Sequence, residues 1–296
     1  MHGQVDQFLD YLKDEKGYSE NTIVAYRNDL NQFVTFLKQV TTSTVNSWTE
    51  VDQQLILAYG MHLEEQKYAA STIARKVAAV KSFFSFMIGA ALLTDNPTTL
   101  LTAPRVEKRL PRVLSPDEVE SLLAEPAKAT TPKALRDQAL LDLLYATGMR
   151  VSEVVTLQMN DVGLEKAQIV CEGRDGRARQ LPLTPQAIES LSDYVEKGRK
   201  ALLRDRKEAT LFVNHRGHPL TRQGLWLIIK SYAEAAGVGP DVTPHTLRHS
   251  FAAHRLARGG DLQKVRELLG HANISTTQVY AHLVSHQDDE SAANLA

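Results

Sequence analysis

A basic, proline-rich segment, APRVEKRLPRVLSP at residues 103–116, divides this chain into two regions with different patterns. Its three prolines disfavour a continuous helix, and its basic residues suit an extended strap along phosphates, although an ordinary solvated linker has the same composition. We expect a first domain at residues 1–103, a linker at 104–116, a second domain at 117–284 and a tail at 285–296. The basic residues of the linker are Arg105, Lys108, Arg109 and Arg112.

The first region has apolar residues at helical spacing in four stretches. The first covers residues 5–16, and the second follows Ser19, which is a suitable N-cap. Thr49 is the expected cap of the third helix, and the fourth runs over about 70–90. These stretches predict a helical domain with short connections.

The second region mixes helices with a hairpin. Strands are expected at residues 168–171 and 180–183, because Asp175-Gly176 between them is a strong hairpin turn signal. Helices are expected at residues 117–124, 135–147, 185–203, 221–236, 246–258, 262–269 and 275–281. The predicted fold class is therefore mostly α with a small antiparallel β-hairpin.

Composition excludes several classes of protein. Lys and Arg number 34 against 35 Asp and Glu, so the net charge of −1 gives no sign of a nucleic-acid partner. Cys171 is the single cysteine, which rules out an intrachain disulfide or a cysteine-based zinc site. The N-terminus does not resemble a signal peptide, and the most apolar stretch, residues 77–93, is too short and too polar to span a bilayer. We expect a cytoplasmic protein that does not bind membranes.

Five residues of the second region carry chemistry when taken together. Arg150 lies in ATGMRVSEV, His245 and Arg248 lie in PHTLRHSFAAH, and His271 precedes Tyr280 by nine residues in LLGHANISTTQVYAH. Each motif alone is more often structural than functional, since arginines form surface ion pairs and a single tyrosine usually packs.

Together these residue types suit the cleavage of a phosphodiester by a tyrosine. The transition state gathers negative charge on the non-bridging oxygens, and planar guanidinium groups match that geometry. A phenol has a pKa of about 10 and needs a base or a positive field to become a good nucleophile. Histidine can take that proton or donate a hydrogen bond to phosphate. No metal is required, since the arginines supply the positive charge.

The motifs resemble the tyrosine recombinase (integrase) family, most closely its Xer-type site-specific members. YSENTIVAYRNDLNQFVTFL and YAASTIARKVAAVKSFFSF are similar to the core-binding domain of that family. ATGMRVSEVVTLQMNDV and TPHTLRHSFAAHRLARGGDLQKVRELLGHANISTTQVYAHL are similar to its catalytic domain. The resemblance covers about residues 4–284. It implies a helical core-binding domain and an α+β catalytic domain that form a C-shaped clamp around duplex DNA.

The resemblance also implies catalytic roles at the matched positions. Tyr280 would attack the scissile phosphate, form a 3′-phosphotyrosyl link and release a 5′-hydroxyl. Arg150 and Arg248 would hold the non-bridging oxygens. His245 would be the general base toward Tyr280 or a phosphate ligand, and His271 would complete the phosphate cradle.

Further residues are expected to support the site or to contact DNA. Glu153, one helical turn after Arg150, matches an acidic position that would orient the cradle through a charge pair. The predicted DNA contacts outside the linker are Arg75, Lys76, Arg177 and Arg179.

One position departs from the family pattern. Arg174 stands in the hairpin where the family has a lysine that would protonate the leaving 5′-oxygen, and arginine is a poor acid. Three interpretations stay open. Arg174 stabilises the leaving oxygen while water supplies the proton, a nearby lysine such as Lys166 supplies it, or cleavage is slow or gated by a partner.

The family resemblance implies a tetramer on two paired double-stranded DNA sites, with a monomer or dimer off DNA. It leaves open a second recombinase or an activating translocase as partner. No cofactor is expected, because the chain has no P-loop and no GxGxxG motif. His245 and His249 are four residues apart but lack the HExxH pattern, so no metal site is expected.

The leading hypothesis is a site-specific recombinase that resolves chromosome dimers. The alternatives are a mobile-element integrase of the same family, a type IB topoisomerase with the same tyrosine chemistry, and a non-catalytic DNA-binding protein. The tail after Leu283 is acidic, and Leu295 is its single large apolar residue, so the family's docking of that tail on a neighbour is in doubt.

Overall fold

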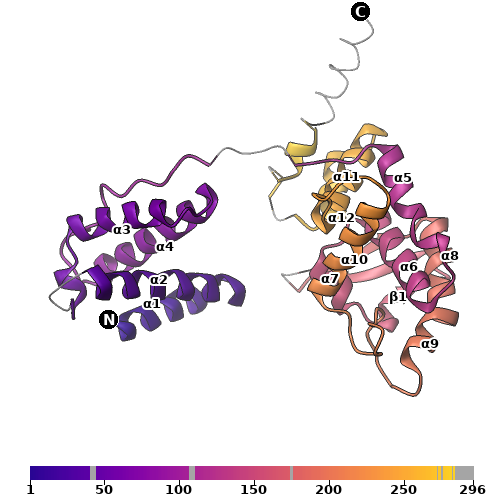
Figure 1. The fold of residues 1–296 in the computed structure, drawn as a ribbon, viewed down its shortest axis with the longest axis horizontal. Coiled ribbons are helices and arrows are strands. Elements are labelled where there is room, and N and C mark those ends of the chain that lie inside the picture. Colours follow the sequence, from indigo (N-terminus) through magenta and orange to yellow (C-terminus); the bar gives the residue numbers. More distant parts are fainter. Residues whose placement is uncertain are drawn as a thin grey trace, which may run out of the picture. The chain divides into compact units, whose positions relative to one another are not determined.

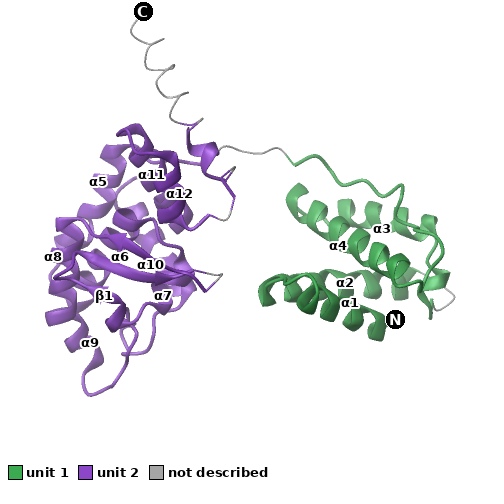
Figure 2. Ribbon diagram, turned by 180° about the vertical axis from the view of Figure 1, so that it is seen from behind, with its two compact units in different colours: residues 1–108 green, residues 109–296 purple. Residues whose placement is uncertain are grey.

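The structure, a computed structural model, describes residues 1–40, 45–106, 111–173, 176–271, 273–274, 276–281 and 283. The chain divides into two compact units, residues 1–108 and 109–296 (Figure 2). The boundary between the units falls inside the predicted linker, residues 104–116. Among the described helices, none combines the length and the apolar character that a membrane span requires.

Unit 1 is helical, as the apolar periodicity predicts (Figure 1). Its core contains edge-to-face and tilted rings, such as Phe8 against Phe83 with centroids 5.6 Å apart and Trp48 against Phe83 at 4.6 Å. Its described α-helices are α1 (His2–Asp14), α2 (Glu20–Val40), α3 (Gln53–Glu65) and α4 (Ala70–Gly89).

The predicted cap of the third helix is wrong. Thr49 lies inside a 3-10 turn, Trp48–Glu50, which is capped by Ser47. The helix begins later, where the Asp52 carboxylate accepts a hydrogen bond from the Leu55 amide at 2.9 Å. An aspartate three residues before a free amide is a strong cap, so it sets the helix start.

Unit 2 surrounds the long helix α6, which packs against α8 and α11 (Figure 1). A three-stranded antiparallel sheet, in the order β1-β2-β3, carries the predicted hairpin, with Cys171 opposite Arg179. Its strands are β1 (Val162–Gly163), β2 (Gln168–Glu172) and β3 (Ala178–Pro182). Its helices are α5 (Pro116–Ala124), α6 (Pro132–Thr147), α7 (Val151–Thr156), α8 (Pro185–Asp193), α9 (Lys200–Leu203), α10 (Arg222–Ala235), α11 (Pro244–Ala257) and α12 (Leu262–Leu269). Residues 276–281 are also helical.

The single helix predicted at residues 185–203 is interrupted. Between α8 and α9 the backbone forms a π-helical segment, Tyr194–Arg199. The Tyr194 hydroxyl and the Arg199 guanidinium both donate to the Leu211 carbonyl, at 3.0 Å each. The wider π turn brings residues five apart onto one face, which lets both side chains reach this carbonyl.

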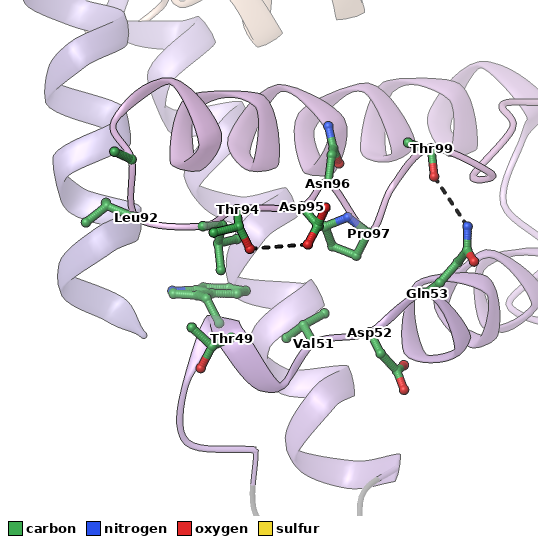
Figure 3. A pocket seen from close by; sticks show the side chains of 13 residues that line it. Thr49, Val51, Asp52, Gln53, Leu92, Thr94, Asp95, Asn96, Pro97 and Thr99 are labelled. Carbon is green, nitrogen blue, oxygen red and sulfur yellow. Dashed lines mark hydrogen bonds between the residues drawn. The ribbon is translucent and has the colours of Figure 1, made fainter.

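Unit 1 contains a hollow of about 540 Å³ between the segment that precedes α3 and the loop that follows α4 (Figure 3). Gln53 and Thr99 hydrogen-bond across it at 3.3 Å, and Asp52 and Asp95 contribute carboxylates. None of the described residues that line it is basic, so the hollow does not suit a phosphate.

Candidate active site

The carboxyl end of α12 organises the candidate site. Three successive carbonyl oxygens there each accept a hydrogen bond from a different arginine. Carbonyls at the end of a helix carry partial negative charge, so they favour cations. The carbonyls of residues 268, 269 and 270 accept from Arg179 Nε at 2.9 Å, Arg248 Nη2 at 2.6 Å and Arg150 Nη2 at 2.6 Å, respectively.

Two glycines in the left-handed region shape this arrangement. Gly148 ends α6 with φ of 60°, and Gly270 ends α12 with φ of 61°. The Gly148 carbonyl accepts from Arg248 Nη1, so Arg248 joins the ends of both helices. A Cβ at Gly270 would lie 3.2 Å from Arg179 Nη1, closer than most side-chain contacts. Glycine therefore suits both the backbone turn and the close approach of the arginines.

The buried carboxylate of Glu153 on α7 fixes two of these arginines. It accepts from Arg150 Nη1 at 2.8 Å and from the Arg150 amide at 2.7 Å. It also accepts a bidentate pair from Arg179, at 3.0 and 2.8 Å. Burial favours the neutral acid, but the hydrogen bonds from Arg179 and Arg150 outweigh it and hold the pKa of Glu153 below its usual value.

Arg248 and His271 are hydrogen-bonded to each other. Arg248 is 5% exposed, and burial together with nearby Arg150 lowers its pKa to about 10, so it stays charged at neutral pH. Its Nη2 lies 3.0 Å from His271 Nε2. A guanidinium has no acceptor, so His271 Nε2 must accept, and its Nδ1 donates to Thr277 Oγ1 at 3.0 Å. Burial and Arg248 lower the pKa of His271 to about 4, which fits this neutral tautomer.

Tyr280 lies in the helical segment 276–281 and is 3% exposed. It packs against a small apolar cluster that includes Phe251 and Leu269, and its ring centroid is 6.4 Å from that of His271. Its hydroxyl lies 2.7 Å from His249 Nδ1. Burial raises the pKa of Tyr280 while Arg248 opposes the rise, so the phenol is neutral at pH 7 and is hydrogen-bonded to His249.

His245, the predicted base, is exposed one turn before His249 on α11, with ring centroids 6.3 Å apart. The sequence pattern missed His249 as a partner of Tyr280, although its spacing from His245 places it on the same helical face. Within the part of the chain that the structure describes, no three His, Cys, Asp or Glu side chains form a metal-binding group.

The structure thus brings four of the predicted catalytic residues together, with His245 beside them. Arg174, Lys108 and Arg109 lie outside the described residues. Arg105 and Arg177 are exposed, whereas Arg112 donates to the Val238 carbonyl at 2.6 Å.

The predicted contacts Arg75 and Lys76 in unit 1 both pair with the buried carboxylate of Asp29. The Arg75 side chain is half exposed, while the Lys76 side chain is buried with its Nζ 3.1 Å from Asp29 Oδ1. A phosphate contact by Lys76 would therefore require it to leave Asp29.

Chemically, the site holds fixed positive charge beside a buried phenol and two neutral imidazoles.

The chain matches the model of the phage integrase family over residues 112–287 and that of the phage integrase N-terminal SAM-like domain over residues 5–90. The chain belongs to the phage integrase family. It is a tyrosine recombinase, a DNA strand-exchange enzyme.

Relatives of this recombinase include Xer proteins. It is 50% identical over 285 residues to tyrosine recombinase XerC of Roseiflexus castenholzii, covering 96% of this chain and 90% of that one. It is 42% identical to tyrosine recombinase XerD of Halalkalibacterium halodurans, covering 96% and 94%. The structure of XerH recombinase bound to palindromic difH in a post-cleavage complex has the same fold, with a TM-score of 0.77, 24% identity and coverage of 98% and 84%. The helical and α+β domains predicted from the sequence are those of this fold.

Proposed function

We propose that this recombinase is of the Xer type and resolves chromosome dimers in the cytoplasm, cutting and rejoining duplex DNA at a specific site through Tyr280. The observation that carries this proposal is the convergence of Tyr280, His271 and Arg248 at the end of α12. A nucleophile, a guanidinium and an imidazole within one small region are what phosphodiester cleavage needs.

In this proposal Arg150 and Arg248 neutralise the charge that builds on the non-bridging oxygens. Their bonds to Glu153 and to helix-end carbonyls fix the guanidinium planes before DNA arrives, so little reorganisation is needed in the transition state. His271 orients Arg248, and the exposed His245 suits a phosphate ligand.

The proposed partner is a double-stranded DNA site, and the proposed assembly is a tetramer. Strand exchange between two duplexes requires four cleavages, and each subunit contributes one Tyr280. The identity of 50% with XerC and 42% with XerD supports the Xer-type role.

A nicked suicide substrate that carries the host's candidate recombination site tests the proposal. The short fragment released after cleavage diffuses away, so the covalent protein–DNA adduct accumulates. We expect the wild-type chain to form the adduct and Tyr280→Phe to abolish it.

Tyr145→Phe is the matched control, because the Tyr145 hydroxyl also lies 2.8 Å from a histidine Nδ1 of α11, that of His254. This variant should keep forming the adduct. An adduct that persists in Tyr280→Phe would overturn the assignment of the nucleophile.

A further inference from the structure

We propose that His249, rather than His245, takes the phenolic proton of Tyr280 during strand cleavage. This inference rests on the proposed function of Tyr280 as the nucleophile. In the sequence, His249 stands out solely because it lies four residues after His245, and the proposal assigns it a catalytic role.

The contact that supports the proposal is short and shielded. His249 Nδ1 lies 2.7 Å from the Tyr280 hydroxyl, and the two ring centroids are 5.4 Å apart. Tyr280 is almost fully buried, which limits access of water to the phenol. A nucleophile and a base within hydrogen-bond reach are the usual arrangement for activating a hydroxyl.

The other two histidines of the site are less suited to accept this proton. His271 accepts a hydrogen bond from Arg248 at Nε2 and carries its proton at Nδ1, toward Thr277, so both of its nitrogens are engaged. His245 is exposed, and its ring stacks against that of His249 at 28° with the centroids 6.3 Å apart. His249 is therefore the histidine whose ring nitrogen lies within hydrogen-bond reach of the phenol.

Cleavage exchanges one bond to phosphorus for another. The Tyr280 oxygen bonds to phosphorus, and the bond from phosphorus to the 5′-oxygen breaks. The electron pair leaves with the 5′-oxygen, which takes a proton from water. The phenolic proton moves to His249 Nδ1 and gives an imidazolium, and it returns to Tyr280 when the strand is rejoined.

The surroundings of His249 keep its ring neutral before DNA binds. Burial, with the nearby His245 and Arg248, lowers the pKa of His249 to about 4, so the ring is neutral at neutral pH, and in its Nε2–H tautomer the lone pair of Nδ1 faces Tyr280. The groups that face the ring are His245 and Arg248 on α11, Tyr280, and His271 after α12. A bound phosphate anion offsets the positive field of Arg248 and makes protonation of His249 more favourable.

The test compares His249→Asn with His254→Asn on the nicked suicide substrate. Asparagine at position 249 can accept a hydrogen bond near the place of Nδ1 but cannot take a proton. His254 is the matched control on the same helix, since its Nδ1 accepts from or donates to Tyr145 at 2.8 Å. We expect His249→Asn to slow adduct formation by about 10²–10⁴-fold with DNA binding retained, and His254→Asn to stay close to wild type.

A substrate with sulfur in place of the bridging 5′-oxygen distinguishes the loss of a general base from the loss of a general acid. Sulfur leaves without a proton, so it restores cleavage to a variant that lacks the acid but not to one that lacks the base. We expect His249→Asn to stay slow on this substrate, with a rate that rises with pH as the phenol ionises unaided. Full restoration, or a wild-type rate on the ordinary substrate, would overturn the proposal.

Chemical rescue covers the case in which asparagine disturbs folding. Added imidazole should restore cleavage to His249→Ala, and a variant that binds DNA but stays inactive with imidazole contradicts the assignment.

The wild-type reaction shows which of the two proposals fails, that for the function or that for His249. Without a wild-type adduct the proposed function fails, whereas equal adduct formation by wild type and His249→Asn defeats the role of His249 alone.

Discussion

At the scale of single residues, Glu153 is the group that fixes the side chains of Arg150 and Arg179. Its carboxylate accepts from Arg150 and Arg179 at 2.8–3.0 Å while it is itself buried. Removing one member of a buried charge cluster leaves the others uncompensated, which costs more than the cluster contributes when intact. Two guanidinium groups would then repel each other beside the proposed phosphate position.

Glu153→Gln should therefore lower both stability and activity. We expect the free energy of unfolding at pH 7 to fall by about 3 kcal/mol, and adduct formation to fall more than DNA binding. Because the folded-state pKa of Glu153 is depressed, its contribution is complete above its ordinary pKa of 4.5 and is lost as the pH falls through the lower folded value. Urea unfolding of both proteins across this range checks the sign, and a difference that grows toward acid pH would contradict it.

At the scale of elements, two helix ends meet at the site, and each needs a glycine. Arg248 donates to the carbonyl of Gly148 at the end of α6 and to that of Leu269 at the end of α12. A Cβ on Gly148 would lie 2.4 Å from Phe251 Cδ1, on the helix that carries Arg248. The position of the arginine is therefore coupled to the turn that ends α6.

Gly148→Ala should destabilise unit 2 by about 3 kcal/mol, from backbone strain and from overpacking against Phe251. Gly237→Ala is the matched control, because Gly237 follows α10 with φ of 69° and a Cβ at that position would meet no atom within 4 Å. It should cost about 1 kcal/mol from strain alone. Thermal unfolding compares the two variants, and equal losses would show that the contact with Phe251 does not matter.

Local patterns predicted the elements better than they predicted the contacts of the site. The apolar stripe of α2 and the Asp-Gly pair in the sequence between β2 and β3 are local signals, so the helix and the pairing of the two strands follow from the sequence. The two-residue strand β1 is too short to have a period, and it forms because it pairs with β2. The π turn at Tyr194 likewise depends on a distant carbonyl.

The catalytic residue types could be predicted from the chemistry of phosphodiester cleavage. The hydrogen-bond partners of those residues could not, because they depend on tertiary contacts. No spacing shows that Arg179 shares Glu153 with Arg150, because the two arginines come from β3 and from the start of α7. The contact of His249 with Tyr280 joins residues 31 positions apart, and the spacing from His245 gave the single local hint.

At the scale of the whole molecule, the net charge of −1 does not oppose a role on DNA. Basic groups are concentrated in short segments, and several of them are committed to internal carboxylates or carbonyls, as for Arg179 and Lys76. The expected consequence is modest non-specific affinity, with binding that relies on site-matched contacts.

The salt dependence of DNA binding tests the predicted linker contact. Arg105→Ala should lower the slope of log K against log salt by about 0.9, as expected for one lost phosphate contact. Lys197→Ala is the control, because Lys197 is exposed and pairs with Asp193 at 2.7 Å on α8. Titrations at several salt concentrations measure both slopes. An unchanged slope for Arg105→Ala would show that Arg105 makes no phosphate contact, as expected for an ordinary solvated linker.

Peptide mapping of the adduct shows whether Tyr280 becomes covalently bound to the 3′ end of the cut strand. Trypsin cuts after Arg266 and nowhere within residues 267–296, so the peptide that begins at residue 267 carries Tyr280 as the single tyrosine of that range. Mass spectrometry of the nuclease-trimmed adduct should find the nucleotide on that peptide, joined to Tyr280 through a 3′-phosphate. A nucleotide on any other peptide would rule out Tyr280 as the nucleophile, and one joined through a 5′-phosphate would rule out the 3′-phosphotyrosyl link.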